Sequence, residues 1–126
     1  MRLLLDTNAL LWWLEGSRRL SRAAVDAIDD VANEVHVSAA SAWEISTMAR
    51  LGKLRFTGSL AARLEKFDVR PLAVTVEHGW AAGTLPPVHR DPFDRILVAQ
   101  AQLEELVVVT ADPVFARYGV AVFATA

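Results

Sequence analysis

The chain of 126 residues has no cysteine, which excludes disulfide bonds and zinc sites built from thiolates. It also has no run of about 18 uncharged apolar residues, so we expect no membrane-spanning helix and no membrane partner. The opening segment, residues 1–5, imitates a signal peptide, but Asp6 and Asn8 interrupt its apolar run. Together these absences predict a protein of the reducing cytoplasm.

An excess of positive charge is missing as well, because 13 basic residues face 15 acidic ones and give a net charge of −2. Such a balance is a poor signature of a protein that binds nucleic acid over a broad surface. The basic residues are nevertheless clustered, at Arg18, Arg19 and Arg22, at Arg50, Lys53 and Arg55, and at Arg90 and Arg95. Local contacts with a polyanion therefore stay open.

Apolar side chains are abundant, at 53% of all residues, which argues against a disordered chain. The length fits one domain, residues 1–126, that buries roughly two thirds of its unfolded surface. Strand patterns at 2–6, 34–38, 71–75, 106–110 and 120–123 alternate with helix patterns at 8–15, 21–32, 39–52, 59–67, 77–83 and 91–105, with a short helix expected at 112–113. Strands separated by helices predict an α/β fold, with a central parallel sheet flanked by helices on both faces.

The first expected helix, 8–15, is apolar nearly all round. A helix of this kind is either buried in the core or lies at an interface. Tryptophan is enriched among the residues that anchor protein interfaces, and this helix contains Trp12 and Trp13. We therefore expect the helix or its neighbours to contact a protein partner, with Trp12 or Trp13 as an anchor.

Two carboxylates stand directly behind strand patterns. Asp6 ends the strand that contains Leu3–Leu5, and Asp112 follows the strand at 107–110 in the same way. The carboxyl ends of parallel strands meet at one edge of a sheet, where open α/β folds place their ligands. We therefore expect Asp6 and Asp112 to lie at the same edge.

Two further carboxylates, Glu44 and Asp94, lie in expected helices. The residues three, four and seven positions beyond Asp94 are Leu97, Val98 and Ala101, so this carboxylate lies on the stripe that faces the core. The same steps from Glu44 also reach mainly apolar positions. An ionised side chain on a buried helix face costs several kcal/mol unless it is paired or bound to a metal.

Together, the four acids predict a metal site. Two carboxylates about 4 Å apart repel each other by roughly 4 kcal/mol at an effective dielectric constant near 20. No basic residue is placed in the sequence to relieve all four acids, whereas a divalent cation would do so. Oxygen ligands favour Mg²⁺ or Mn²⁺ over zinc or copper, so we predict that one of these ions is held by Asp6, Glu44, Asp94 and Asp112.

Each acid also has a purely structural interpretation. Asp112 precedes Pro113 and is suited to cap a helix. Asp94 stands third in its helix, where the helix dipole favours an acid. Glu44 lies on the surface if its helix has a different phase. Independently of this, Asp6 is suited to an ordinary turn after its strand. The joint occurrence of the four in one chain is what favours the metal interpretation.

Polar residues beside these acids are candidates for a supporting role. Asp91 is suited to cap the helix that begins at Pro92, and it is also a candidate for orienting a metal-bound water or a ligand. Four more polar residues have two interpretations: Thr7, Asn8, Ser38 and Thr110. They either hold the carboxylates in place or are ordinary turn and strand-end residues. The three histidines show no metal-ligand spacing, and we expect structural or exposed positions for them, with His89 the nearest to a substrate: His36, His78 and His89.

At these residues the chain resembles the PIN domains, and among them the VapC-type toxin ribonucleases. The resemblance covers nearly the whole chain and rests on four segments in order: 3–8, 38–45, 89–95 and 110–112. It implies a parallel sheet wrapped by helices, with metal-dependent RNA cleavage at its acidic edge. The family's metal-binding acids are matched by Asp6, Glu44, Asp94 and Asp112, and its supporting polar positions by Thr7, Asn8 and Thr110.

The resemblance also implies products and partners. It implies cleavage of RNA to a 5′-phosphate and a 3′-hydroxyl, a homodimer, and a cognate antitoxin that covers the site. The basic residues expected to contact RNA are Arg90, Arg95 and Lys53. In two respects the chain departs from many relatives: Met48 stands where they have a lysine, and no second acid lies just beyond Asp112.

We therefore predict a Mg²⁺- or Mn²⁺-dependent endoribonuclease that acts as the toxin of a toxin-antitoxin pair. The expected direct ligands are Asp6, Asp94 and Asp112, with Glu44 either a ligand or a base that positions water. Two other classes stay open. One is a different Mg²⁺-dependent phosphotransfer enzyme, such as a haloacid-dehalogenase-like phosphatase or a receiver domain. The former needs a second aspartate two residues after its nucleophilic aspartate, where this chain has Asn8. A non-catalytic module would use the same fold only to bind RNA or protein.

Overall fold

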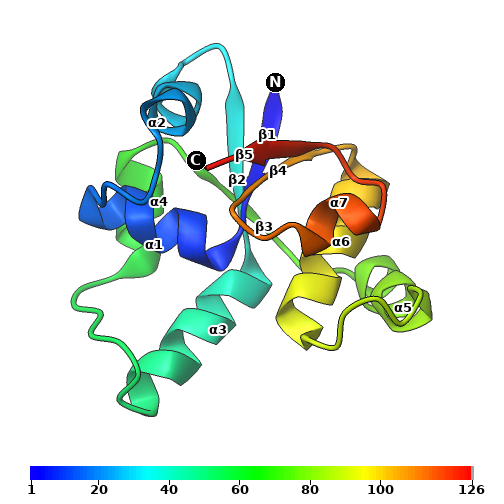
Figure 1. Ribbon diagram of the computed structural model, residues 1–126. Helices are drawn as coiled ribbons and strands as arrows, with labels where there is room; N and C mark the ends of the chain where they lie inside the picture. Colours follow the sequence, from blue (N-terminus) through cyan, green and yellow to red (C-terminus); the bar gives the residue numbers. More distant parts are fainter. Residues whose placement is uncertain (126) are drawn as a thin grey trace.

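One sheet of parallel strands organises the molecule. The computed structural model describes residues 1–125, and within them the strands lie in the order β3-β2-β1-β4-β5 (Figure 1). Their bounds are β1 Arg2–Leu5, β2 Glu34–Ser38, β3 Arg70–Leu72, β4 Val107–Thr110 and β5 Val122–Ala124. The prediction of a central parallel sheet is confirmed.

The helices of the described residues are α1 Thr7–Glu15, α2 Arg22–Asp29, α3 Ala39–Arg50, α4 Leu60–Lys66, α5 Val76–Thr84, α6 Pro92–Glu104 and α7 Val114–Arg117. Serine caps begin two of them, because the Ser21 and Ser59 hydroxyls accept hydrogen bonds from backbone N–H groups in the first turns of α2 and α4. Pro92 occupies the first position of α6, where a missing N–H costs nothing. None of these helices has both the length and the apolar character that crossing a bilayer requires.

The central strand β1 is apolar on both of its sides. Leu3 and Leu5 point into a core that α1, α2 and α4 cover, whereas Leu4 points into a second core beneath α6 and α7. This alternation follows from the two-residue period of a strand. All three leucines are completely buried. Helices therefore cover both faces of the sheet, as predicted.

The strand order reverses between β1 and β4. From β1 the chain moves outward through β2 to β3, and it then returns through α5 and α6 to place β4 on the other side of β1. In open parallel sheets such a reversal leaves a crevice at the carboxyl ends of the two strands, and ligands bind there. Leu5 pairs with Val109 at this edge, so the residues that follow them face the same crevice.

Several element boundaries differ from the sequence prediction. α2 ends before Asp30, which is extended and whose carboxylate accepts a hydrogen bond from Ala32 N in a turn. β3 covers only Arg70–Leu72, because this edge strand pairs with β2 alone over three residues. The short helix expected at 112–113 begins at Val114, and the last strand begins at Val122.

The tryptophans of α1 pack within their own chain. Trp12 and Trp13 are half-buried against the core on the α1 face of the sheet. The Trp13 ring meets Phe67 edge to face at 5.3 Å, and its indole N–H donates a hydrogen bond to Asp29. The apolar character of α1 is therefore explained largely by burial, and the expected interface anchors are less available than predicted.

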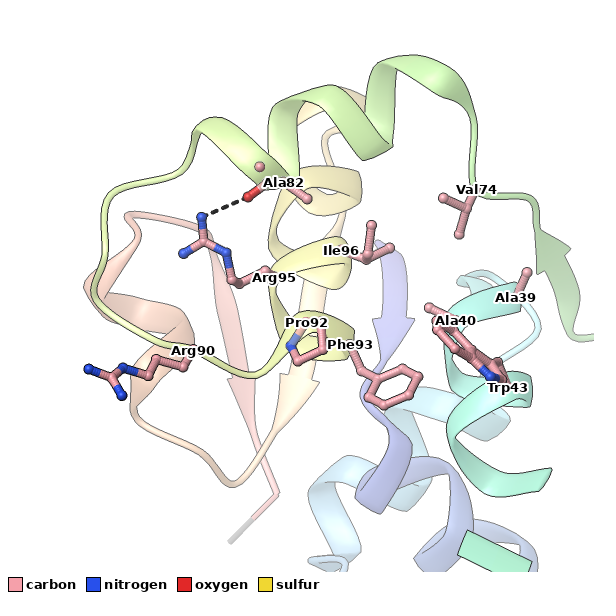
Figure 2. A pocket seen from close by; sticks show the side chains of 11 residues that line it. Ala39, Ala40, Trp43, Val74, Ala82, Arg90, Pro92, Phe93, Arg95 and Ile96 are labelled. Atoms are coloured by element: carbon pink, nitrogen blue, oxygen red, sulfur yellow. Dashed lines mark hydrogen bonds between the residues drawn. The ribbon is translucent and has the colours of Figure 1, made fainter. Parts of the chain in front are cut away.

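The most exposed tryptophans are Trp43 of α3 and Trp80 of α5, at 65% and 78% exposure. Trp43 meets Phe93 of α6 edge to face at 4.9 Å, beside an apolar groove of about 580 Å³ that α3, α5 and α6 line (Figure 2). The exposure of Trp43 and Trp80 cannot be predicted from a local sequence pattern, because it depends on how the three helices pack.

Candidate metal centre

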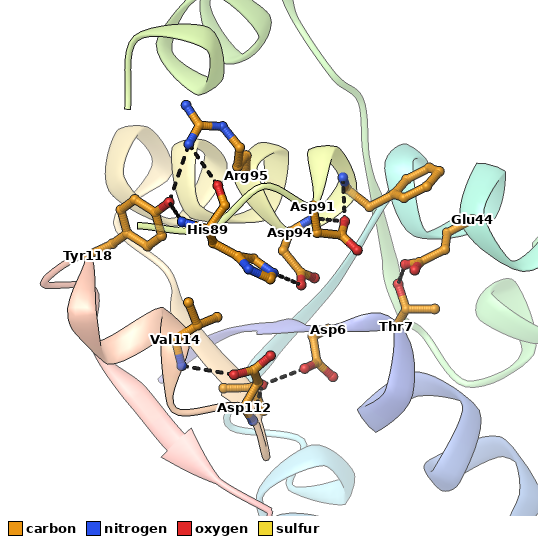
Figure 3. Close-up of polar contacts among 12 residues, drawn as sticks. Asp6, Thr7, Glu44, His89, Asp91, Asp94, Arg95, Asp112, Val114 and Tyr118 are labelled. Carbon is orange, nitrogen blue, oxygen red and sulfur yellow. Dashed lines mark hydrogen bonds and ion pairs between the residues drawn. The ribbon is translucent and has the colours of Figure 1, made fainter. Parts of the chain in front are cut away.

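A cleft of about 280 Å³ opens at the carboxyl ends of β1 and β4. It is lined by Asp6, Thr7, Asn8, Glu44, Asp91, Asp94, Ala111 and Asp112. The fold therefore gathers all four predicted acids, together with Asp91, from segments far apart in the sequence (Figure 3). Its position matches the strand reversal at which open α/β sheets bind ligands.

Asp6 lies at the bottom of this cleft and is 6% exposed. Its carboxylate caps α1 by accepting a hydrogen bond from Ala9 N at 2.8 Å, and its second oxygen accepts one from the Thr110 hydroxyl. Burial raises the pKa of the Asp6 carboxyl, and the charges of Asp112 and Glu44 raise it further, against the two hydrogen bonds that lower it. The site therefore holds Asp6 where its charge is costly without a cation.

Thr110 connects two of the acids. Its hydroxyl donates to Asp6 and accepts a hydrogen bond from Asp112 N at 2.9 Å. Asp112 is exposed, and one of its oxygens accepts from Val114 N at 2.9 Å at the start of α7. Asp112 therefore lines the cleft and is tied to the turn before α7, but the N-cap position of this helix is Pro113 and not Asp112. Its role as a metal ligand stays a prediction.

Glu44 reaches the cleft from α3. The Thr7 hydroxyl donates a hydrogen bond to Glu44 Oε1 and lies 3.1 Å from Ser41 Oγ. Burial raises the pKa of Glu44, and the Asp91 charge raises it further, while the Thr7 hydrogen bond lowers it. Ser38 does not line the cleft. Instead it caps α3 by accepting from Ala40 N, and it thereby fixes the helix that carries Glu44.

Asp91 and Asp94 both belong to the start of α6. Asp91 caps the helix, because one of its oxygens accepts from Phe93 N at 2.9 Å and from Asp94 N at 3.1 Å. Burial raises the pKa of Asp94 to about 6, and the charges of Asp91 and Glu44 contribute, against the hydrogen bond from His89. Asp91 therefore positions Asp94 and also adds negative charge to the cleft.

His89 contacts the acids of the cleft more closely than its sequence position indicates. Its Nε2 lies 2.9 Å from Asp94 Oδ2. One ligand atom each from His89, Asp94 and Asp112 lie within 4.8 Å of one another. Sequence spacing did not predict this group, because the turn that folds His89 back onto α6 is held by contacts distant in the sequence.

Arg95 holds the protein's own backbone. Its two terminal nitrogens donate hydrogen bonds of 2.8–3.1 Å to four backbone carbonyl oxygens in α5 and in the segment between α5 and α6. These are the carbonyl oxygens of Ala82, Leu85, Pro86 and His89. These nitrogens are therefore committed to the scaffold and are not directed at the acidic cleft. The predicted contact of Arg95 with RNA stays a prediction, which these backbone contacts do not favour.

The other two basic residues do not line the cleft either. Arg90 lines the neighbouring apolar groove, and its side chain points away from Trp43 (Figure 2). Lys53 is exposed in the segment that follows α3. Their predicted contacts with RNA stay predictions.

Within residues 1–125, no lysine or arginine forms an ion pair with any of the five acids of the cleft. His89 is their one basic contact there. Five clustered carboxylates, three of them with a raised pKa, present the oxygen donors that hard divalent cations prefer. The residues therefore fit Mg²⁺ or Mn²⁺.

Comparison with known proteins gives matches along nearly the whole chain. The family model of the PIN domain matches residues 3–121. Ribonuclease VapC22 of Mycobacterium tuberculosis is 31% identical over 112 residues, which cover 86% of this chain and 85% of that protein.

Solved structures give the same result for the fold. VapBC2 from Rickettsia felis, bound to a DNA fragment from its promoter, matches with a TM-score of 0.68 and 13% identity over 98% of both chains. A toxin-antitoxin complex from Klebsiella pneumoniae matches with a TM-score of 0.61 and 20% identity over 87% of this chain and 86% of that one. At these identities the two structures support the fold alone.

The raised pKa of Asp94 makes a prediction for metal-free protein. An acid whose folded-state pKa lies above its ordinary value of 3.8 destabilises the fold as pH rises from about 4 through about 6. Asp94→Asn lacks this titration. In EDTA, the free energy of unfolding of the variant minus that of wild type should therefore increase by roughly 1–2 kcal/mol between about pH 4 and pH 7. This value is smaller than the full pKa shift implies, because the side chain is partly hydrated. Urea unfolding at several pH values measures this difference.

The control for this measurement is Asp26→Asn, which changes an exposed acid paired with Arg22. It should stay within about 0.5 kcal/mol of wild type at every pH. A difference between Asp94→Asn and wild type that does not change with pH would show that the carboxyl of Asp94 is not destabilised by its surroundings.

Proposed function

The chain belongs to the PIN-domain family, and on that premise we propose that it is a metal-dependent endoribonuclease acting as the toxin of a toxin-antitoxin pair. PIN domains typically bind a divalent metal. The observation that carries the proposal is the convergence of Asp6, Glu44, Asp94 and Asp112 on one cleft without a lysine or arginine partner in residues 1–125. Residues 1–126 then form one nuclease domain.

In this proposal Asp6, Asp94 and Asp112 hold Mg²⁺ or Mn²⁺. The bound cation supplies a lowered pKa for water and stabilisation of the negative charge that develops on the phosphate and the leaving oxygen. Thr110 fixes the carboxylate of Asp6 through the hydroxyl hydrogen bond, and thereby sets where its second oxygen points.

Glu44 is either a further ligand or the base that accepts a proton from the attacking water. Its raised pKa suits the second role, because a general base works best when its pKa approaches the operating pH. Thr7 occupies Oε1 by donating to it, so Oε2 is the oxygen free to accept that proton. Asn8 also lines the cleft, and its side-chain amide is a neutral donor for a phosphate oxygen. Arg90 and Lys53 contact the RNA backbone farther away.

Two other functions find less support. A haloacid-dehalogenase-like enzyme needs an acid where this chain places the amide of Asn8 in the cleft. Each raised pKa in the cleft marks a cost to stability, which metal binding would offset. A non-catalytic module has no need to hold these carboxylates together at such a cost. Cleavage of RNA by the purified chain separates this module from the nuclease.

The proposed partners are RNA, a cognate antitoxin and a second copy of the chain. A structure described as a toxin-antitoxin complex shares the fold, which supports the antitoxin. The apolar surface around α5 supports association with protein. Val76 and Trp80 are 89% and 78% exposed there, and a second apolar groove lies beside Trp43. Clustered exposed apolar side chains mark interaction sites.

Replacement of Asp6 tests the chemistry. Asp6→Asn keeps the shape of the side chain and its hydrogen bond from Ala9 N but removes a full charge from the metal ligands. With Mg²⁺, cleavage of a structured RNA should fall by roughly two orders of magnitude or more, because activation of water by the metal supplies much of the rate. In metal-free buffer the variant should fold at least as well as wild type.

The matched control is Asp26→Asn, the same chemical change at an exposed residue of α2. It should cleave like wild type. Asp6→Asn should be purified in parallel, and circular dichroism should verify that it is folded. If this variant cleaved RNA at the wild-type rate, the proposed nuclease would be refuted and the binding module would remain.

The exposed apolar surface of α5 predicts self-association through this helix. Trp80→Glu places a charge at the centre of this surface, so it should reduce a wild-type dimer to a monomer of 13.8 kDa in light scattering. Val31→Glu, which adds the same charge at a residue that is 100% exposed elsewhere, should leave the dimer intact. A wild-type monomer at high concentration, or a Trp80→Glu dimer, would contradict this assignment of the interface.

A further inference from the structure

His89 stands at the edge of the acidic cleft with its imidazole turned toward the acids. Its Nε2 is 2.9 Å from Asp94 Oδ2, and the two side chains are 29% and 21% exposed (Figure 3). One ligand atom each from His89, Asp94 and Asp112 lie within 4.8 Å of one another. Two ligands on opposite sides of a transition-metal ion are roughly 4 Å apart. The three side chains need only small movements to share one ion.

The backbone of His89 is fixed from both sides. Its N–H donates to the Tyr118 hydroxyl at 2.9 Å, and its carbonyl oxygen accepts from Arg95 at 3.1 Å. The Tyr118 hydroxyl in turn donates to Pro86 O at 3.2 Å. Tyr118 directly follows α7, and Arg95 lies in α6. The two elements next to Asp112 and Asp94 therefore also hold His89, which is how a preorganised ligand set is built.

The other two side chains are also oriented by hydrogen bonds that leave an oxygen free. Asp112 accepts from Val114 N with Oδ1, so its Oδ2 has no partner among the described residues. Asp94 contacts His89 through Oδ2 alone. A bound cation would replace the proton shared by His89 and Asp94, and it would also relieve the repulsion between the two carboxylates.

We propose that His89 is a metal ligand together with Asp94 and Asp112, and that this mixed nitrogen and oxygen site prefers a first-row transition ion such as Mn²⁺ over Mg²⁺. This inference rests on the proposed metal-dependent function and narrows its cation. Mg²⁺ takes oxygen ligands almost exclusively, whereas imidazole suits transition ions. Neutral imidazole nitrogen is also the commonest protein ligand for such metals. The alternative is that His89 only orients Asp94 by a hydrogen bond.

His89→Gln separates the two roles, because a glutamine amide can still donate a hydrogen bond to Asp94. Calorimetric titration of the full chain with MnCl₂ and with MgCl₂ gives both affinities. Wild type should bind Mn²⁺ at least about tenfold more tightly than Mg²⁺. The variant should lose about tenfold or more of its Mn²⁺ affinity and keep its Mg²⁺ affinity within about threefold. Unchanged Mn²⁺ affinity would overturn the ligand role.

A spectroscopic measurement detects a metal-bound nitrogen directly. Pulsed electron paramagnetic resonance of Mn²⁺ bound to wild type should show modulation from a directly bound nitrogen, and His89→Gln should lose it. His36→Gln is the matched control, because His36 also lies beside an acid, with Nε2 3.6 Å from Glu34, but outside the cleft. It should retain the signal.

The outcomes also separate this inference from the proposed function. Mn²⁺ that binds wild type without nitrogen coupling overturns the role of His89 and leaves an all-carboxylate metal site standing. A wild-type chain that binds neither Mn²⁺ nor Mg²⁺ overturns both proposals.

Discussion

Repulsion among carboxylates at one edge of the sheet is the constraint around which this site is built. Asp6 is almost fully buried, and burial raises its pKa most; the nearby charges of Asp112 and Glu44 raise it further. The fold contributes a fixed hydrogen-bond donor to three of the acids: Thr110 to Asp6, Thr7 to Glu44, and the backbone N–H of Val114 to Asp112. These hydrogen bonds orient the oxygens, but they do not supply the positive charge that would balance the cluster. A divalent cation is the ligand that such an arrangement accommodates best.

The surrounding scaffold is organised to keep this cluster in place. The reversal of strand order puts the ends of β1 and β4 side by side, which fixes Asp6 and the segment of Asp112. The start of α6 is secured twice, by the Asp91 cap and by Arg95, whose guanidinium ties down the preceding segment. Loss of Arg95 would therefore disturb the position of His89 and Asp94 without touching either carboxylate of the central strands.

Much of this arrangement follows from sequence pattern, and the remainder has a physical reason for escaping it. Asp6 and Asp112 are predictable because a strand-end acid in a parallel sheet has one place to go, and Asp94 because the helical period fixes its face. His89 and Arg95 are different. Their roles depend on the path of the segment between α5 and α6 and on Tyr118, which is 29 residues from His89 in the sequence. The half-burial of Trp12 and Trp13, and the exposure of Trp43 and Trp80, likewise depend on helix packing that no local pattern encodes.

Anomalous diffraction from crystals soaked in MnCl₂ shows directly whether the acids of the cleft share a cation. If they do, a strong anomalous peak should lie in the cleft, about 2.0–2.5 Å from oxygens of Asp6, Asp94 and Asp112. Ordered crystals with Mn²⁺ bound elsewhere, and with only water between these carboxylates, would contradict a shared cation.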